Sequence, residues 1–250
     1  MNWHIGCSGF YYRHWKGLFY PEDMPQRMWF DYYCQHFSTL ELNGSFNSFP
    51  KIRSLKNWYL SNPMEFNFAV KAHRTITHFR QFQNTKDIVN DFYQVVSDGL
   101  QEKLGAVLFQ MPPKFTYSLA RLDSILNNLN PLFNNVVEFR HISWWQPDVY
   151  TELAKHNISF CGMSHPALPA DIVANTPTLY YRLHGNQQFY HSAYTEKELA
   201  EFANKALDTR AQKAYIYFNN DIGASAVYNA TDLIRLASSM QISNKSITPI

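Results

Sequence analysis

The sequence is poor in the features that mark membrane, secreted and metal-binding proteins. Its 250 residues contain no apolar run of about 18 or more residues that would span a bilayer. The first residues lead directly into a strand-like pattern, without the charged and apolar regions of a signal peptide. The three cysteines, Cys7, Cys34 and Cys161, are odd in number and widely spaced, which argues against a disulfide framework and a cysteine zinc site. We therefore expect a cytoplasmic protein with three reduced thiols and no membrane segment.

Features that divide a chain into several units are also missing. We find no internal repeat, no low-complexity tract and no linker rich in glycine and serine. The net charge of +2 lacks the strong positive bias of a typical nucleic-acid-binding protein. The length and a hydrophobic fraction of 46% suit one domain with an extensive core. We predict a single domain over residues 1–242, followed by a frayed tail over residues 243–250.

Short apolar segments of strand-like composition alternate with segments of helical periodicity along the chain. The strand-like runs cover residues 4–8, 40–46, 66–73, 106–110, 136–141, 158–164, 180–185 and 215–220. The helical candidates cover residues 29–37, 52–60, 88–100, 119–129, 149–155, 196–207 and 224–237. After the sixth run, residues 167–173 are too short and too proline-rich for a helix to be predicted. Two helix starts carry specific signals, a capping box from Thr195 to Glu198 and a proline, Pro147, in a first turn.

This alternation predicts parallel strands joined by right-handed helical crossovers. An open doubly wound sheet would usually have fewer strands and a glycine-rich phosphate turn after the first strand, whereas residues 7–12 do not form a G-x-G-x-x-G motif. Eight runs instead favour an α/β fold of the (β/α)₈ type, a TIM-type barrel. In that fold, the C-terminal ends of the strands and the loops that follow them build the functional site.

Polar side chains recur near the C-terminal ends of the runs, in one phase of the strand alternation. In residues 39–43, for example, Glu41 and Asn43 face one way while Leu40 and Leu42 face the other. The same phase in the other runs gives an inward-facing set made of Ser8, Glu41, Asn43, Lys71, His73, Gln110, Glu138, Arg140, Arg182, His184 and Asn219. The shared phase predicts an active or binding centre inside the barrel mouth.

The charges of this set indicate an anionic ligand. Two carboxylates face three cations, Lys71, Arg140 and Arg182, so a phosphate or carboxylate on a ligand is the natural complement. A purely structural reading is that Glu41 pairs with Lys71 and that Glu138 pairs with a neighbouring cation. Lys71 would form a Schiff base only if desolvation or nearby cations lowered its pKa, and an ion-paired lysine is the simpler expectation.

We assign roles to the candidate residues on this basis. The candidate catalytic residues, which would move protons, are Glu41, Glu138, His73 and His184. The candidate ligand-binding residues are Ser8, Asn43, Lys71, Gln110, Arg140, Trp144, Arg182, Tyr194, Asn219 and Asn220. No His-x-His or H-E-x-x-H motif is present, so we assign no metal ligand and no cofactor, although two carboxylates and several histidines would allow a divalent ion.

The loops that follow the strands are unusually aromatic. Aromatic rings lie in residues 10–21, 74–80, 143–145 and 187–194, and in all of these but 143–145 they are interleaved with Arg, Lys or His. Such loops stack on bases or sugars, or alternatively their rings, Trp15, Phe19 and Tyr20 among them, plug the barrel mouth and pack the loop onto the body. The last strand-to-helix turn, residues 219–226, leads into a helix whose free N–H groups suit an anion.

Several of these segments together resemble the YecE-like family, known as domain of unknown function 72, along essentially the whole chain. The matching segments are residues 6–9, 15–21, 41–43, 68–71, 77–78, 108–113, 138–140, 143–144, 182–185, 217–220 and 229–230. The resemblance implies a TIM-type barrel, with a loose likeness to endonuclease IV and the sugar isomerases, and it leaves the activity unassigned. Phe10 and Asn47 depart from the family pattern, and no complete set of endonuclease-type metal ligands is present.

Three functional hypotheses follow. The first is a metal-independent enzyme that acts on an anionic ligand such as a nucleotide, a sugar phosphate or a nucleic-acid end. The second is a non-catalytic module that binds nucleotides or nucleic acid through its aromatic, basic mouth. The third is an interaction scaffold that has only inherited its polar centre. The sequence leaves open whether the protein is an enzyme at all, and what its oligomeric state is.

Overall fold

Eight parallel strands close into a barrel in sequence order, with β1 hydrogen-bonded to both β2 and β8. The computed structural model describes residues 1–185 and 192–245. The strands are β1 (Asn2–Ser8), β2 (Thr39–Leu42), β3 (Asn67–Lys71), β4 (Leu104–Gln110), β5 (Asn135–Glu138), β6 (Ile158–Ser164), β7 (Thr178–Leu183) and β8 (Lys213–Phe218). The predicted single-domain TIM-type barrel is confirmed.

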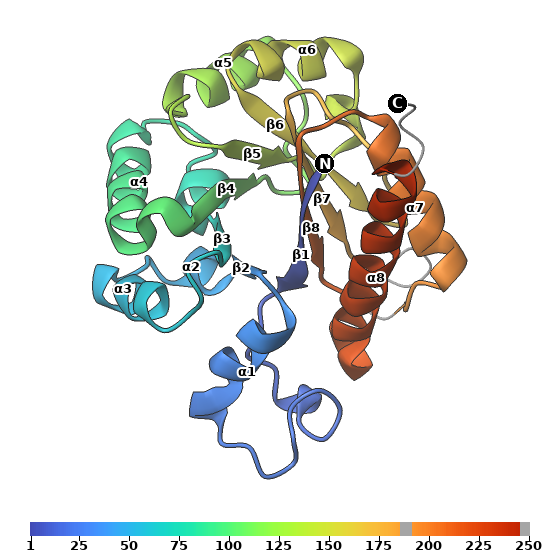
Figure 1. Ribbon diagram of the computed structural model, residues 1–250. Coiled ribbons are helices and arrows are strands. Elements are labelled where there is room, and N and C mark those ends of the chain that lie inside the picture. The colour runs from blue at the N-terminus through green and yellow to red at the C-terminus, as the bar shows by residue number, and fades with distance from the viewer. Residues whose placement is uncertain (186–191, 246–250) are drawn as a thin grey trace.

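Helices surround the ring of strands (Figure 1). They are α1 (Trp29–His36), α2 (Gly44–Asn47), α3 (Ile52–Leu60), α4 (Lys86–Leu100), α5 (Leu119–Asn128), α6 (Pro147–Lys155), α7 (Glu196–Asp208) and α8 (Ser225–Lys245). Residues 165–177, all of them described, contain no helix, as their proline-rich sequence predicted. None of the helices in the described part of the chain has the length and apolar character that a membrane span requires.

Two helix starts form as their sequence signals predicted. The side chain of Thr195 accepts a hydrogen bond from the backbone N–H of Glu198, whose carboxylate accepts one from the N–H of Thr195, so α7 begins with a capping box. Pro147 stands in the first turn of α6, where its missing N–H would have had no partner within the helix.

The last helix is longer than the sequence predicted. Helix α8 continues to Lys245, three residues into the segment interpreted as a frayed tail from Ser243. No glycine or proline precedes Pro249 in this region, so nothing local ends the helix at residue 242. The remainder of the predicted tail, residues 246–250, lies outside the described residues.

Side chains inside the barrel form a core separate from the one beneath the helices. The interior cluster is made of Ala69, Ala106, Leu108, Val136, Cys161, Tyr180, Tyr215 and Tyr217. Their neighbours of opposite phase, such as Leu40, Val70 and Phe109, belong to the larger cluster that includes buried helix residues. The strand phase predicted from the sequence therefore holds, and it directs the polar strand ends into the barrel mouth.

Candidate functional site

Arg182 stands at the centre of the barrel mouth and joins two buried carboxylates. It lies near the end of β7, with its side chain 2% exposed. Its Nη2 donates to Glu41 Oε1 at 2.7 Å and to Ser8 Oγ at 2.9 Å, and its Nη1 donates to Glu138 Oε2 at 2.7 Å. Glu41 also accepts hydrogen bonds from Ser8 and, at 2.6 Å, from the hydroxyl of Tyr180. One guanidinium thus compensates carboxylates from β2 and β5 across the barrel.

A second arginine extends this network toward the loops. Arg140 follows β5, and its Nε donates to Glu138 Oε1. Its Nη2 lies 3.0 Å from Nε2 of His184, and the side-chain amide of Asn219 lies 3.0 Å from Nδ1 of the same ring. The two arginines therefore hold Glu138 between them, and His184 connects Arg140 to the end of β8.

The protonation states in this network follow from burial and neighbouring charge. Burial alone would raise the pKa of Glu138, but Arg140 and Arg182 outweigh it and hold that pKa well below its ordinary value. Burial, reinforced by the same two arginines, lowers the pKa of His184 well below 6.5. At neutral pH the site therefore holds an ionised Glu138 and a neutral His184.

Lys71 has a different environment from the two arginines. It ends β3, is 9% exposed, donates to Gln110 Oε1 at 2.6 Å and lies 4.1 Å from the centroid of the Phe46 ring. The ion pair expected between Glu41 and Lys71 is not formed, because Arg182 already occupies that carboxylate. Among the described residues, no carboxylate lies within ion-pairing distance of Lys71. Burial, and next Arg182, lower the pKa of Lys71 to about 8.

Two residues of the predicted site lie away from this network. The ring of His73 packs 5.8 Å from that of Phe49, and its Nδ1 accepts from the N–H of Thr75. Trp144 is fully buried, stacks on Phe139 at 4.0 Å and donates from its indole N–H to a backbone carbonyl. Both follow a strand by one or more residues, where the alternation of the strand no longer fixes direction.

Tyr194 and Asn220 lie in the loops after β7 and β8 and make hydrogen bonds within the protein. The hydroxyl of Tyr194 donates to Ser164 Oγ and accepts from the N–H of Gly185, both at 2.7 Å. The amide nitrogen of Asn220 donates to Asn229 Oδ1 at 3.0 Å, while its Oδ1 is buried with no partner among the described residues. The backbone N–H of Tyr194 donates to Asn229 Oδ1 and the carbonyl of Tyr194 accepts from Asn229 Nδ2, both at 2.9 Å, so Asn229 of α8 holds both the loop after β7 and Asn220.

Asn43 lies just beyond β2, directly before α2. It is partly exposed, but its Oδ1 is buried and has no hydrogen-bond donor among the described residues. Ser45, in the same short helix, donates to the backbone carbonyl of Lys71 at 2.6 Å. Helix α2 is thereby attached to the end of β3, beside the site.

The structure adds a histidine that the strand pattern did not select. His78 lies in a turn of π-helix, Thr75–Phe79, and its ring packs 4.9 Å from the Phe46 ring that also contacts Lys71. Burial, and next Lys71, lower its pKa from 6.5. The loop composition and the family resemblance over residues 77–78 both signalled this residue, whereas the strand alternation did not, because a π-turn has no period that a sequence pattern reveals.

The aromatic loop after β1 is mostly packed. Trp15 and Tyr20 are 0% and 1% exposed, and Tyr20 stacks on Trp29 at 4.6 Å. Trp15 donates from its indole N–H to the carbonyl of Asp221 at 2.9 Å, which attaches this loop to the end of β8. These rings plug and brace the mouth. Of the aromatic loop predicted over residues 187–194, residues 187–191 lie outside the described residues.

In the part of the chain that the structure describes, no three His, Cys, Asp or Glu side chains lie close enough together to hold a metal ion. The carboxylates at the centre instead have arginine as their partner. The thiol of Cys161 donates to the carbonyl of Gly162 at 3.3 Å and lies 4.0 Å from Glu138 Oε2. Cys7, Cys34 and Cys161 are free thiols in the structure.

Comparison with known proteins places this geometry in a family. The model of a protein family of unknown function, DUF72, matches residues 4–249. The chain belongs to the DUF72 family. It is 24% identical over 256 residues to the UPF0759 protein YunF of Bacillus subtilis (strain 168), with 87% of this chain and 89% of that protein covered.

Solved DUF72 structures share the barrel. A family member from Thermotoga maritima MSB8 matches with a TM-score of 0.87 and 25% identity, covering 95% of this chain and all of that one. A family member from Enterococcus faecalis V583 matches with a TM-score of 0.78 and 18% identity, over 94% of this chain and 95% of that one. The predicted YecE-like membership is confirmed.

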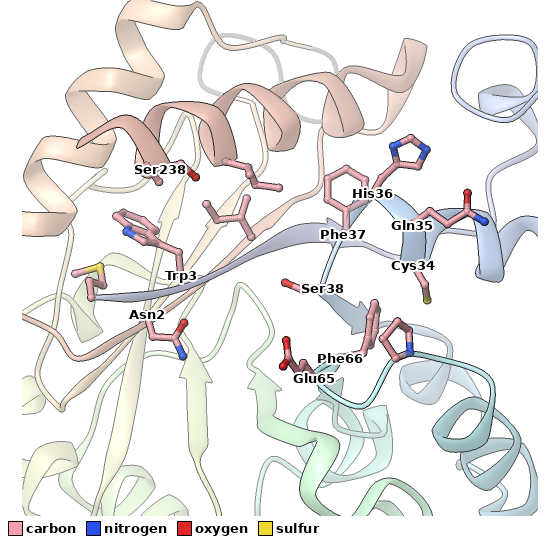
Figure 2. A pocket seen from close by; sticks show the side chains of 15 residues that line it. Asn2, Trp3, Cys34, Gln35, His36, Phe37, Ser38, Glu65, Phe66 and Ser238 are labelled. Carbon is pink, nitrogen blue, oxygen red and sulfur yellow. The ribbon is translucent and has the colours of Figure 1, made fainter. Parts of the chain in front are cut away.

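A cavity of about 470 Å³ lies at the opposite, N-terminal end of the barrel. Figure 2 shows Trp3, Phe37 and Phe66 around it, together with Cys34 and Glu65. Its lining lacks the arginine–carboxylate network of the mouth. The polar chemistry and this hollow are therefore at different ends of the molecule.

Proposed function

We propose that this DUF72 protein is an enzyme that binds a small molecule carrying a phosphate or carboxylate group at the barrel mouth. The anion contacts Lys71 and Arg140, and the neutral ring of His184 takes part in proton transfer. Arg182 orders the two carboxylates beneath the ligand. The ligand class covers nucleotides and sugar phosphates.

The observation that carries this proposal is the charge balance of the centre. Glu41 and Glu138 are offset by Arg182 and Arg140, so the positive charge of Lys71 has no carboxylate partner among the described residues. A buried charge without a counterion destabilises the folded protein unless a ligand supplies the counterion. A ligand anion would do so, and its charge-assisted hydrogen bonds would be strong in this water-poor mouth.

The packing of the mouth supports a small ligand over a nucleic acid. Trp15, Tyr20 and Trp144 are each at most 1% exposed and closed to stacking on bases. In the described parts of the aromatic loops, this leaves Tyr11 and Phe79, at 57% and 68% exposure, as the open rings. A groove for nucleic acid also needs many phosphate contacts, whereas in the described part of the central network one cation, Lys71, lacks a carboxylate partner.

A thermal-shift titration with inorganic phosphate and with citrate tests the proposal. We expect wild-type protein to be stabilised by one or both anions, and Arg140→Gln to weaken the apparent affinity by about tenfold, because one charge-assisted contact is lost. The matched control is Arg235→Gln, since Arg235 is 62% exposed and pairs with surface carboxylates. Wild-type protein that responds to neither anion, or an unchanged affinity in Arg140→Gln, would contradict the proposal.

A further inference from the structure

We propose that the amine of Lys71 forms a Schiff base with the carbonyl group of an aldehyde or ketone that also carries a phosphate or carboxylate. The inference rests on the proposed function, since the anion site would hold the charged group of the same ligand. It narrows the ligand class to anionic carbonyl compounds and assigns Lys71 a covalent role.

The position of Lys71 suits a nucleophile. Its amine reaches the mouth from the end of β3, where the catalytic groups of such barrels lie, and the residue retains 9% exposure. Its hydrogen bond to Gln110 and its contact with Phe46 involve uncharged groups. Both contacts favour the protonated amine, but less strongly than a carboxylate partner would.

A second buried lysine shows what a structural environment looks like. Lys103 is 5% exposed, and its amine donates to the carbonyl of Tyr59 at 2.8 Å and to two oxygens of Asn62 at 2.9 and 3.1 Å. All three of its N–H groups are used, so the charged form is solvated by the protein. Within the described ranges Lys71 makes one such bond, to Gln110, so its remaining N–H groups can donate to a ligand.

Charged groups from four elements surround the Lys71 amine. Arg182 and Arg140 disfavour its protonated form, Glu138 and Glu41 favour it, and burial tips the balance toward the neutral amine. His78 faces the same space with a lowered pKa of its own. With a pKa of about 8, about a tenth of Lys71 is neutral at pH 7, far more than of an exposed lysine.

The reaction balances without an external oxidant or reductant. The neutral amine attacks the carbonyl carbon, a C–N bond forms, and the carbonyl oxygen takes up a proton while the nitrogen releases one to water. Protonation of the resulting hydroxyl lets the C–O bond break, water leaves, and the nitrogen lone pair forms the C=N bond. The iminium product keeps the positive charge of the lysine, so the compensation of an anionic ligand is unchanged.

Reductive trapping tests the proposal on the intact protein. Wild-type protein is incubated with glyceraldehyde 3-phosphate and sodium cyanoborohydride at pH 7, and the adducts are located by peptide mass spectrometry. We expect Lys71 to be modified at least about tenfold faster than Lys197, whose side chain is 86% exposed, and Lys103 to stay unmodified. Unphosphorylated glyceraldehyde should label Lys71 more slowly, because it lacks the group that the anion site holds.

Two variants and one binding measurement complete the design. Lys71→Arg should lose the fast adduct, whereas Lys197→Arg should retain it. If Lys71→Arg fails to fold, the relative labelling rates of Lys71 and Lys197 in wild-type protein test the proposal by themselves. Labelling of Lys71 no faster than Lys197 would overturn the proposal. If phosphate stabilises the protein but no adduct forms, the anion site is supported and the Schiff base is contradicted. If Lys71 forms an adduct at the same rate with both aldehydes and phosphate does not stabilise the protein, the reactive amine is supported and the anion site is contradicted.

Discussion

The two ends of the barrel interior are filled in opposite ways. Toward the N-terminal end, His4 stacks on Tyr215 with 4.6 Å between ring centroids, and the hydroxyl of Tyr217 is 2.6 Å from Thr39 Oγ1. Toward the C-terminal end, the interior is occupied by Arg182 and the two glutamates that it joins. One end is built of rings and hydroxyls, and the other of ions.

This difference indicates that the desolvation cost of buried charges is concentrated at the C-terminal end of the barrel. Rings stabilise the barrel through buried apolar area, whereas desolvated ions regain at best what their burial costs. A well-packed apolar layer would have closed the mouth at least as stably as the arginine network does. Under the function that we propose, the ions at the C-terminal end serve a ligand, and the following variants test the contrast between the two ends.

The largest effect is expected from removing the ion that joins the two carboxylates. Arg182→Met should lower the free energy of unfolding by about 3 to 5 kcal/mol, because Glu41 and Glu138 lose a shared buried counterion. Urea denaturation at pH 7 measures it. The matched change in the ring-filled end, Tyr215→Phe, should cost below about 1 kcal/mol, since its hydroxyl makes one long hydrogen bond of 3.4 Å. Equal losses in both variants would remove the contrast between the ends.

The second-largest effect is expected from acid, which should lower the stability that the buried carboxylates contribute. The pKa of Glu138 is lower in the folded protein than the 4.5 of an unperturbed glutamate, so its stabilising contribution is complete above about pH 5 and is lost as the pH falls below about 4.5. Between pH 6 and pH 3, wild-type protein should lose about 2 kcal/mol more stability than Glu138→Gln. The control is Glu22→Gln, because Glu22 is 80% exposed and should follow wild type. Parallel curves for wild type and Glu138→Gln would contradict the assignment.

Replacing Lys71 should change the free energy of unfolding in the opposite direction from replacing Arg182. Its pKa falls from 10.5 to about 8 on folding, so folding disfavours its charge, and stability should rise as the pH increases from about 8 to 10.5. Lys71→Met should therefore stabilise the protein by roughly 1 to 2 kcal/mol at pH 7 while weakening phosphate binding. Lys197→Met, on an exposed helix position, should change neither. A destabilised Lys71→Met variant would mean that the lysine is structural.

The sequence predicted the ion-filled end well, because the strand alternation that creates it is local. Ser8, Glu41, Lys71, Glu138 and Arg182 lie inside the barrel as the phase of their strands required. The partners within that end were not predictable. Glu41 pairs with Arg182 of β7 and not with Lys71 of the adjacent strand. Which pair forms depends on how far the side chains reach across the barrel and on how all the charges of the mouth are compensated.

Residues just beyond the strand ends differ in whether the strand alternation still places them in the network. Arg140, two residues beyond β5, joins the network as the alternation predicted, whereas His73, two residues beyond β3, contacts Phe49 instead. The backbone turns away after Lys71, so the ring of His73 packs against Phe49 while a π-turn presents His78 to the mouth. Trp144 has a similar explanation, since a short 3₁₀ turn directs its ring into the outer core.

The smallest effect is expected at the N-terminal cavity. The indole N–H of Trp3 is buried with no hydrogen-bond partner among the described residues, so Trp3→Phe removes an unsatisfied donor together with some apolar contact. These contributions oppose each other, and the free energy of unfolding should change by less than about 1 kcal/mol. Phosphate stabilisation should also be unchanged, as a thermal-shift titration would reveal. A variant that weakened phosphate binding as Arg140→Gln does would tie this cavity to the site and end the functional separation of the two ends.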